Sequence, residues 1–129
     1  MVLGTGTDIL KIQRIRIALK TDDRGSFVRK TFTPEERRQA EERSDPALYY
    51  ATRFAGKEAV FKCFGVESGS LRLNDIEIIA SETGQPKVNL YGDFARLASE
   101  KGIRRIEISL SYEDEYAIAF AVAESEIKP

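Results

Sequence analysis

The sequence contains no histidine, and Cys63 is its only cysteine. Without histidine the chain can form neither a Ser-His-Asp catalytic triad nor an ordinary zinc site, and it lacks the commonest general base near neutral pH. One cysteine allows no internal disulfide and no thiolate metal site, so Cys63 is expected in the core. Any bound metal is therefore expected to be a hard cation held by oxygen atoms.

Long apolar runs are also missing. No stretch approaches the roughly 20 residues that cross a bilayer, and the start MVLGTGTDILKI lacks the basic end and apolar centre of a signal peptide. We therefore expect a cytoplasmic protein with no membrane partner. The 129 residues, of which 42% are hydrophobic and 32% charged, suit one globular domain over residues 1–129.

The net charge is −1, which disfavours general attraction to nucleic acid or to an anionic membrane. Residues 11–30 differ from the rest of the chain, because seven basic side chains there face only two acids. The basic residues are Lys11, Arg14, Arg16, Lys20, Arg24, Arg29 and Lys30, and the acids are Asp22 and Asp23. A partner that binds this segment is expected to be acidic.

Apolar periodicity and turn residues predict an α+β fold, with helices packed on a small antiparallel sheet. Glycine, proline and capping residues delimit the elements. Strands are expected at residues 2–9, 75–80, 87–90, 104–110 and 116–124, and helices at 11–20, from 34 to about 44, at 46–64 and at 92–101. In the last strand bulky residues alternate with alanines, so one face is flat enough for a helix to lie against it.

The long helix and the first strand both carry a face of small residues. At about 100° per residue, Ala51, Ala55, Gly56, Ala59 and Cys63 gather on one side of the helix. The strand presents Gly4, Gly6 and Asp8 on one face, and glycine permits very close packing. If these two faces meet, Asp8 becomes a neighbour of Glu58.

Two neighbouring carboxylates repel unless a cation or a proton relieves them, and Mg²⁺ commonly binds one or two carboxylates together with phosphate oxygens. Lys62, one turn beyond Glu58, could then contact a phosphate. Simpler interpretations remain open: Glu58 and Lys62 can be an ordinary i,i+4 pair, and Asp8 can cap the next helix. Arg53 and Lys57 can cover aromatic rings with their stems and keep their charged heads in water. The Gly84-Gln85-Pro86 stretch can be a simple turn.

Five segments, taken in order, resemble the holo-[acyl-carrier-protein] synthases, which are small 4′-phosphopantetheinyl transferases of fatty acid synthesis. They are GTGTDILKIQRI, FVRKTFTPEE, YYATRFAGKEAVFKCFG, GQPKV and ISLSYEDEYAIAFAVA. The resemblance spans nearly the whole chain. It implies the 4′-phosphopantetheinyl transferase fold and a Mg²⁺-dependent transfer of 4′-phosphopantetheine from coenzyme A to a serine of apo-acyl carrier protein, which leaves adenosine 3′,5′-bisphosphate.

The resemblance also implies roles for individual residues. Asp8 and Glu58 would hold the metal, and Lys62 would contact the pyrophosphate and assist the leaving group. Family members are typically trimers with sites between subunits, so Arg53, the Gly84–Pro86 turn and the region of Ser111 and Tyr112 are expected to bind coenzyme A from two chains. Arg14 matches an arginine that meets the carrier protein, and Ile17 and Ala18 lie beside it on the outward helix face.

Two departures from the family pattern stand out. Many members carry histidine where this chain has Tyr112, and a phenol brings no positive charge at neutral pH. We therefore expect weaker discrimination between coenzyme A and dephospho-coenzyme A. The stretch GVESGS after the long helix also differs from the commoner GTG type, which leaves the contacts to pantetheine open.

Two questions stay open at the level of sequence. The general base can be Glu58 acting through a metal-bound water, or a solvent molecule acting directly. The chain can also be a non-catalytic relative that binds coenzyme A or the carrier protein without turnover, although intact Asp8, Glu58 and Lys62 argue against this. An unrelated nucleotide-binding domain is disfavoured, because the chain has no P-loop and no G-x-G-x-x-G after a strand.

Overall fold

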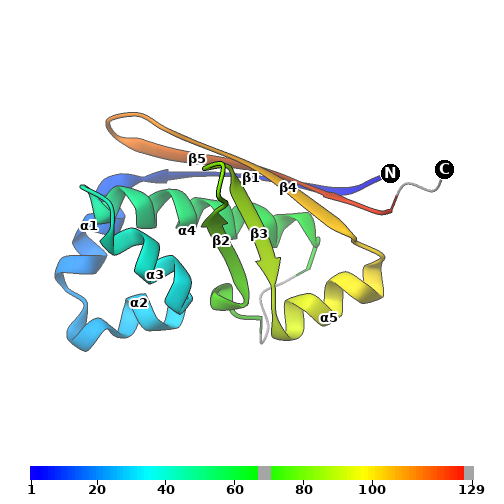
Figure 1. Ribbon diagram of the computed structural model, residues 1–129, viewed down its shortest axis with the longest axis horizontal. Coiled ribbons are helices and arrows are strands. Elements are labelled where there is room, and N and C mark those ends of the chain that lie inside the picture. The colour runs from blue at the N-terminus through cyan, green and yellow to red at the C-terminus, as the bar shows by residue number, and fades with distance from the viewer. Residues whose placement is uncertain (67–70, 127–129) are drawn as a thin grey trace.

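A three-stranded antiparallel sheet forms one layer of the protein (Figure 1). The structure is a computed structural model that describes residues 1–66 and 71–126. The strands of the sheet are β1 (Val2–Lys11), β4 (Arg105–Tyr112) and β5 (Tyr116–Glu124), with β5 in the centre. The alternating alanines of β5 are buried, whereas Ile118 and Phe120 on the other face are 41% and 47% exposed. The flat face predicted from the alternation is thus the face that packs against helices.

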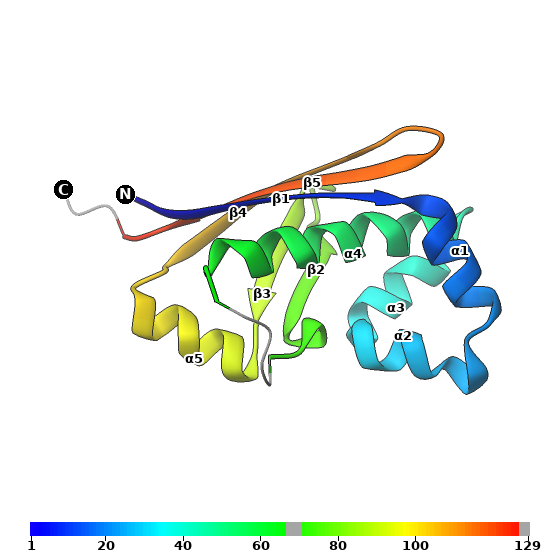
Figure 2. The ribbon, with the colours of Figure 1, turned by 180° about the vertical axis from the view of Figure 1, so that it is seen from behind.

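The long helix α4 (Pro46–Cys63) lies across this flat face (Figure 2). It begins at the predicted cap, where the Asp45 side chain accepts a hydrogen bond from the Leu48 amide. It ends one residue before the predicted end, and Gly65 then takes the left-handed φ of 63° that glycine tolerates. Residues 67–70 of the GVESGS segment lie outside the described part of the structure.

Strand β1 and helix α4 touch through their smallest residues. A Cβ atom added at Gly4 would overlap the carbonyl of Cys63, and one added at Gly6 would overlap the carbonyl of Ala59. Only residues without a Cβ atom allow the two backbones to approach so closely. The predicted contact between these faces is confirmed, and it sets Asp8, two residues beyond Gly6, beside the helix. Burial raises the pKa of the Cys63 thiol to about 11, as suits a core cysteine.

Three short helices and a 3-10 turn gather near the start of α4 (Figure 1). They are α1 (Ile12–Lys20), η1 (Asp23–Gly25), α2 (Ser26–Thr31) and α3 (Pro34–Glu41). Helix α1 buries Ile12 and Ile15 and leaves Arg14 exposed, as predicted. Helix α2 was not predicted, because its capping side chain is distant in sequence: Asp22 accepts hydrogen bonds from the amides of Phe27 and Val28.

Helix α3 starts at the predicted cap and ends earlier than predicted. Thr33 and Glu36 form a capping box, in which each side chain accepts a hydrogen bond from the other residue's amide. The last helical residue is Glu41, whereas the sequence predicts an end near residue 44. The helix ends in two tighter i→i−3 hydrogen bonds, from the Glu42 amide to the Gln39 carbonyl and from the Arg43 amide to the Ala40 carbonyl.

A two-stranded hairpin and one more helix complete the structure. The hairpin consists of β2 (Ile76–Ala80), preceded by the 3-10 turn η2 (Leu73–Asp75), and β3 (Pro86–Leu90), and it matches the prediction. At its tip Gly84 has a φ of 87° and donates a hydrogen bond to the Ser81 carbonyl. Helix α5 (Gly92–Lys101) then leads to β4, and β3 lies beside β4 (Figures 1 and 2).

The alternative interpretation in which Lys57 keeps its charged head in water is wrong. The side chains of Lys57 and Glu36 are both fully buried, and the Lys57 Nζ lies 2.7 Å from the Glu36 Oε1. Lys57 also donates to the backbone carbonyls of Leu73 and Ile76, and the Glu36 carboxylate accepts a hydrogen bond from the Ile78 amide at 2.7 Å. The hairpin covers this side of α4, so the lysine finds its partners inside the protein.

On the outer face of the three-stranded sheet, β1 and β5 expose apolar side chains in the single chain, whereas β4 contributes polar ones. Leu3, Ile9, Ile118 and Phe120 are between 39% and 62% exposed there. Apolar surface of this kind commonly marks a contact with another molecule. Within the described residues, no helix combines the length and the apolar character that a membrane crossing requires.

Candidate active site

Asp8, Glu58 and Lys62 converge where β1 crosses α4. Asp8 follows the glycines on the inner face of β1, and Glu58 and Lys62 are one turn apart on α4. The Lys62 ammonium donates a hydrogen bond to the Thr7 carbonyl at 2.8 Å and lies 3.5 Å from the Asp8 Oδ1. The two carboxyl groups are partly buried, while Lys62 is 54% exposed and can reach a bound molecule.

The charges in this cluster act on one another. Burial raises the pKa of Glu58, the negative charge of Asp8 raises it further, and Lys62 opposes both effects. Burial likewise raises the pKa of Asp8, against the opposing charges of Lys62 and Arg14. The contact of Gly6 with the Ala59 carbonyl and the 3.5 Å approach of Lys62 to Asp8 bring the segments that carry the two acids together, as the packing argument predicted. Two crowded, partly buried carboxylates are a donor set that suits a hard divalent cation.

The cluster holds few protein ligands. Within residues 1–66 and 71–126, no group of three or more acidic, cysteine or histidine side chains is placed to hold a metal ion. A divalent ion bound by Asp8 and Glu58 would therefore take its remaining ligands from water and substrate. Such a ligand set is usual for Mg²⁺ bound together with phosphate groups.

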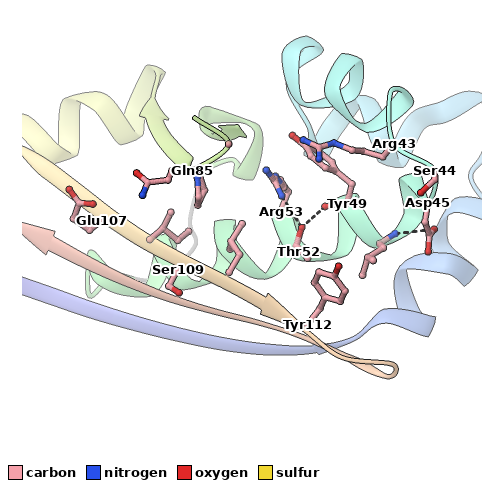
Figure 3. A pocket seen from close by; sticks show the side chains of 15 residues that line it. Arg43, Ser44, Asp45, Tyr49, Thr52, Arg53, Gln85, Glu107, Ser109 and Tyr112 are labelled. Atoms are coloured by element: carbon pink, nitrogen blue, oxygen red, sulfur yellow. Dashed lines mark hydrogen bonds between the residues drawn. The ribbon is translucent and has the colours of Figure 1, made fainter. Parts of the chain in front are cut away.

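A cavity of about 600 Å³ lies on the other side of α4, between the start of that helix, the tip of the hairpin and β4 (Figure 3). Four of the predicted coenzyme A-binding residues line it: Arg53, Gly84, Pro86 and Tyr112. Ser111 is not among the described lining residues. It pairs with Ile118 of β5 and belongs to the outer face of the sheet, which it shares with the cavity residues Glu107 and Ser109.

The cavity carries an excess of positive charge. Its two carboxylates pair with arginines that do not line it: Asp45 lies 2.8 Å from Arg16, and Glu107 lies 3.0 Å from Arg105, which also lies 3.3 Å from Glu124. Arg43 and Arg53 also line the cavity, and neither forms an ion pair with any described residue. The arrangement suits an anionic ligand such as a phosphate ester.

The environment of Arg53 corrects the prediction that its stem covers aromatic rings while its head lies in water. The guanidinium carbon lies 3.9 Å from the centre of the Tyr49 ring, so the charged head itself contacts the aromatic face. The head also donates to the Thr52 hydroxyl at 3.1 Å, and burial lowers the Arg53 pKa. Arg53 is thus held against the cavity wall.

Arg43 and Tyr49 are cavity residues that were not singled out in the sequence. For Tyr49 a signal was present, because the Asp45-Pro46 cap fixes the start of the helix, and positions 45, 49 and 53 then follow at four-residue spacing on one face; Arg43 precedes the helix and is not part of that series. The fourth position of that series is Lys57, which is buried instead. The pattern therefore could not tell which members of the series face the cavity.

The acidic cluster and the cavity lie at opposite edges of the sheet. Asp8 belongs to β1, the cavity is lined by β4, and β5 separates these strands. Two strand spacings amount to about 10 Å. Along α4, the nine residues from Arg53 to Lys62 add about 14 Å. In one chain the two features are therefore separate.

The three residues expected to meet a carrier protein lie together on α1. Arg14 is exposed, Ile17 is 53% exposed, and Ala18 is partly exposed next to them. The outward orientation predicted from the helical spacing is confirmed. Ile12 and Ile15 on the opposite side hold the helix against the core.

Comparison with known proteins assigns the family. Residues 4–121 match the family model of the 4′-phosphopantetheinyl transferase superfamily. The chain is 41% identical over 123 residues to a holo-[acyl-carrier-protein] synthase of Desulforudis audaxviator, covering 95% of this chain and 93% of that protein.

Solved structures of acyl carrier protein synthases are similar over nearly the full length. One from Plasmodium yoelii with ADP bound is 34% identical, covers 98% of both chains and has a TM-score of 0.87. A complex with coenzyme A from Chronobacterium ammoniagenes is 27% identical, covers 96% of this chain and 98% of that one, and has a TM-score of 0.81. The chain belongs to the 4′-phosphopantetheinyl transferase superfamily, and the resemblance noted in its sequence is confirmed.

Proposed function

We propose that this protein transfers the 4′-phosphopantetheine group of coenzyme A to a serine of an apo-acyl carrier protein and releases adenosine 3′,5′-bisphosphate. The observation that carries the proposal is the convergence of Asp8, Glu58 and Lys62, in a chain that matches holo-[acyl-carrier-protein] synthases over almost its whole length. Two acids and a reachable lysine are groups that phosphoryl transfer uses for alignment and charge neutralisation.

We further propose Mg²⁺ as the cofactor, held by Asp8 and Glu58. The fit rests on the two partly buried carboxylates: burial raises the pKa of both, and the charge of Asp8 raises that of Glu58 further, an unfavourable state that a divalent cation relieves. When bound, Mg²⁺ supplies positive charge to the pyrophosphate oxygens and polarises the phosphorus.

The side chains of the cluster have distinct roles in the transfer. The serine oxygen attacks the phosphorus that carries pantetheine, and the bond from that phosphorus to the bridging oxygen breaks, so the bridging oxygen leaves with the nucleotide. Lys62, with its exposed ammonium, offsets the negative charge that develops on this leaving group. Glu58 is proposed to accept the serine proton through an intervening water molecule.

The cavity is the proposed binding site for the nucleotide half of coenzyme A. Arg43 and Arg53 supply charge for phosphate groups, and the tip of the hairpin at Gly84 and Pro86 forms another wall. Tyr112 offers a hydroxyl as donor or acceptor at the rim, where it is 60% exposed.

The carrier protein is proposed to dock on α1. Arg14 offers positive charge, and Ile17 and Ala18 offer apolar surface beside it. The neighbouring segment up to Lys30 is also basic. An acidic, amphipathic helix of the carrier complements this combination.

We also propose a homotrimer with each active site between two subunits. The exposed apolar face of the sheet supports an oligomer, and the separation of the acidic cluster from the cavity supports a site completed by a neighbouring chain. The protein is proposed to act in the cytoplasm, in fatty acid synthesis.

The proposal is tested by incubating the protein with Mg²⁺, coenzyme A and a purified apo-acyl carrier protein, followed by mass spectrometry of the carrier. The expected result is a mass increase of one phosphopantetheinyl group on the carrier serine, absent when that serine is replaced by alanine. Binding of coenzyme A without any modified carrier would support a non-catalytic relative instead.

A further inference from the structure

We propose that Tyr49 is a positioning residue, whose ring holds the guanidinium groups of Arg43 and Arg53 at the cavity wall for the phosphate groups of a nucleotide. This inference rests on the proposed function, because it concerns the same cavity. The three side chains come from the start of α4 and the residues just before it, and they lie together along the cavity (Figure 3).

Both cations lie over the same aromatic ring. The guanidinium carbon of Arg53 is 3.9 Å from the centre of the Tyr49 ring, and that of Arg43 is 4.9 Å from it. Both distances are within the range of a cation–π interaction. Neither arginine has an ion-pair partner among the described residues, whereas the ring contacts both charged heads.

The ring itself is held firmly. Tyr49 is only 5% exposed, and its hydroxyl donates a hydrogen bond to the Gln39 Oε1 at 2.6 Å. Gln39 is in turn fixed to β2 at both ends of its amide, since it accepts from the Ala80 amide at 2.9 Å and donates to the Ala80 carbonyl at 3.2 Å. The orientation of the ring is thus tied to the hairpin whose tip forms another wall of the cavity.

The Tyr49 ring reduces both the repulsion between the two guanidinium groups and their conformational freedom. Two guanidinium groups without carboxylate partners repel each other, and an exposed arginine such as Arg43 otherwise samples many conformations. The negative face of an aromatic ring reduces the repulsion and restricts both heads without occupying their hydrogen-bond donors. Arg53 uses its Nε and one Nη1 donor on the Ile78 carbonyl and the Thr52 hydroxyl. Its Nη2 donors and those of Arg43 remain for phosphate oxygens, and less ordering is needed when the ligand binds.

The test measures binding of adenosine 3′,5′-bisphosphate by titration calorimetry, together with KM and kcat for coenzyme A. Tyr49→Leu removes the ring and is expected to weaken nucleotide binding about tenfold, which corresponds to about 1.4 kcal/mol. KM for coenzyme A should rise with it, while kcat changes less. Tyr49→Phe keeps the ring and should stay within about threefold of the parent protein.

Tyr50→Leu is the matched control. Tyr50 is the next residue of α4 and is equally buried, but it packs on Phe32, with ring centres 4.6 Å apart, and does not line the cavity. Both leucine variants lose a buried ring, and only Tyr49→Leu should lose nucleotide affinity. Equal affinity losses in the two variants, or no loss in Tyr49→Leu, would overturn the inference.

A double-mutant cycle separates positioning from general damage. In an Arg43→Ala background, Tyr49→Leu should weaken binding clearly less than in the parent, because part of its effect acts through Arg43. Additive effects would contradict the inference. If Tyr49→Leu does not fold, Tyr49→Met keeps most of the volume and replaces it in both comparisons. Failure of the parent protein itself to bind the nucleotide would instead count against the proposed cavity function.

Discussion

Replacement of Lys57 by methionine should destabilise the protein strongly, although Lys57 lies next to Glu58 in the sequence and on the same helix as Lys62. The Lys57 ammonium lies 2.7 Å from the Glu36 carboxylate, and both side chains are fully buried. Burial lowers the pKa of Lys57 and raises that of Glu36, and in each case the partner charge opposes the shift. Methionine fills a similar volume but leaves the Glu36 charge in the core without its cation.

Removal of one partner from a buried ion pair costs about 3–5 kcal/mol. For a domain of this size, 1 kcal/mol corresponds to about 4 °C in Tm, so the expected decrease is about 12–20 °C. The double variant Glu36→Leu/Lys57→Met removes both charges and should recover at least half of the loss. The penalty of the single variant should shrink at low pH, because a carboxyl with a raised folded-state pKa gains stability as it takes up its proton.

The assay is thermal unfolding followed by circular dichroism, repeated at pH 5 and pH 8. Lys62→Met is the matched control, since Lys62 is the other lysine of α4 and its side chain is 54% exposed. We expect its Tm to change by no more than a few degrees. A decrease of less than about 3 °C in Lys57→Met, or a double variant less stable than the single one, would refute the reasoning.

Two further predictions concern the site itself. Asp8→Asn and Glu58→Gln should each lower kcat for carrier modification at least about 100-fold, as measured by initial rates, and full activity in either variant would remove the metal proposal. Both variants should also raise Tm at pH 7 in thermal unfolding. The raised pKa values of Asp8 and Glu58 mean that these carboxylates destabilise the folded state when they are ionised. Tyr112→His should increase the preference for coenzyme A over dephospho-coenzyme A, and the increase should be larger at pH 6 than at pH 8, because histidine is charged only at the lower pH. The preference is measured as the ratio of the kcat/KM values for the two substrates. An unchanged ratio at both pH values would count against a role of Tyr112 in this discrimination.

Most of the fold could be predicted from local signals. The capping residues Thr33 and Asp45 set the starts of α3 and α4, and the bulky and small alternation of β5 identified the buried face of the sheet. Each of these signals lies within a few residues of the element that it specifies. Helix α2 was missed because its cap, Asp22, is separated from the helix by the 3-10 turn η1.

The site could be predicted only in part. The glycines of β1 and the small residues of α4 were enough to bring Asp8 beside Glu58, since close backbone contact is possible in few ways. The surroundings of Lys57 depend on where the β2–β3 hairpin packs, and no local pattern specifies that long-range contact. The separation of the cavity from the acids likewise follows from the order of the strands in the sheet, which pairs distant segments.

That separation has a consequence for mixtures of inactive chains. If each active site takes its acids from one subunit and its arginines from a neighbour, then Asp8→Asn and Arg53→Ala damage different halves of the site. Equal amounts of the two variants can be unfolded together and reassembled. The mixed oligomers would then contain an intact active site wherever the undamaged halves of two neighbouring subunits meet. Random assembly makes this about one junction in four, so two nearly inactive preparations would together regain about a quarter of the parent activity.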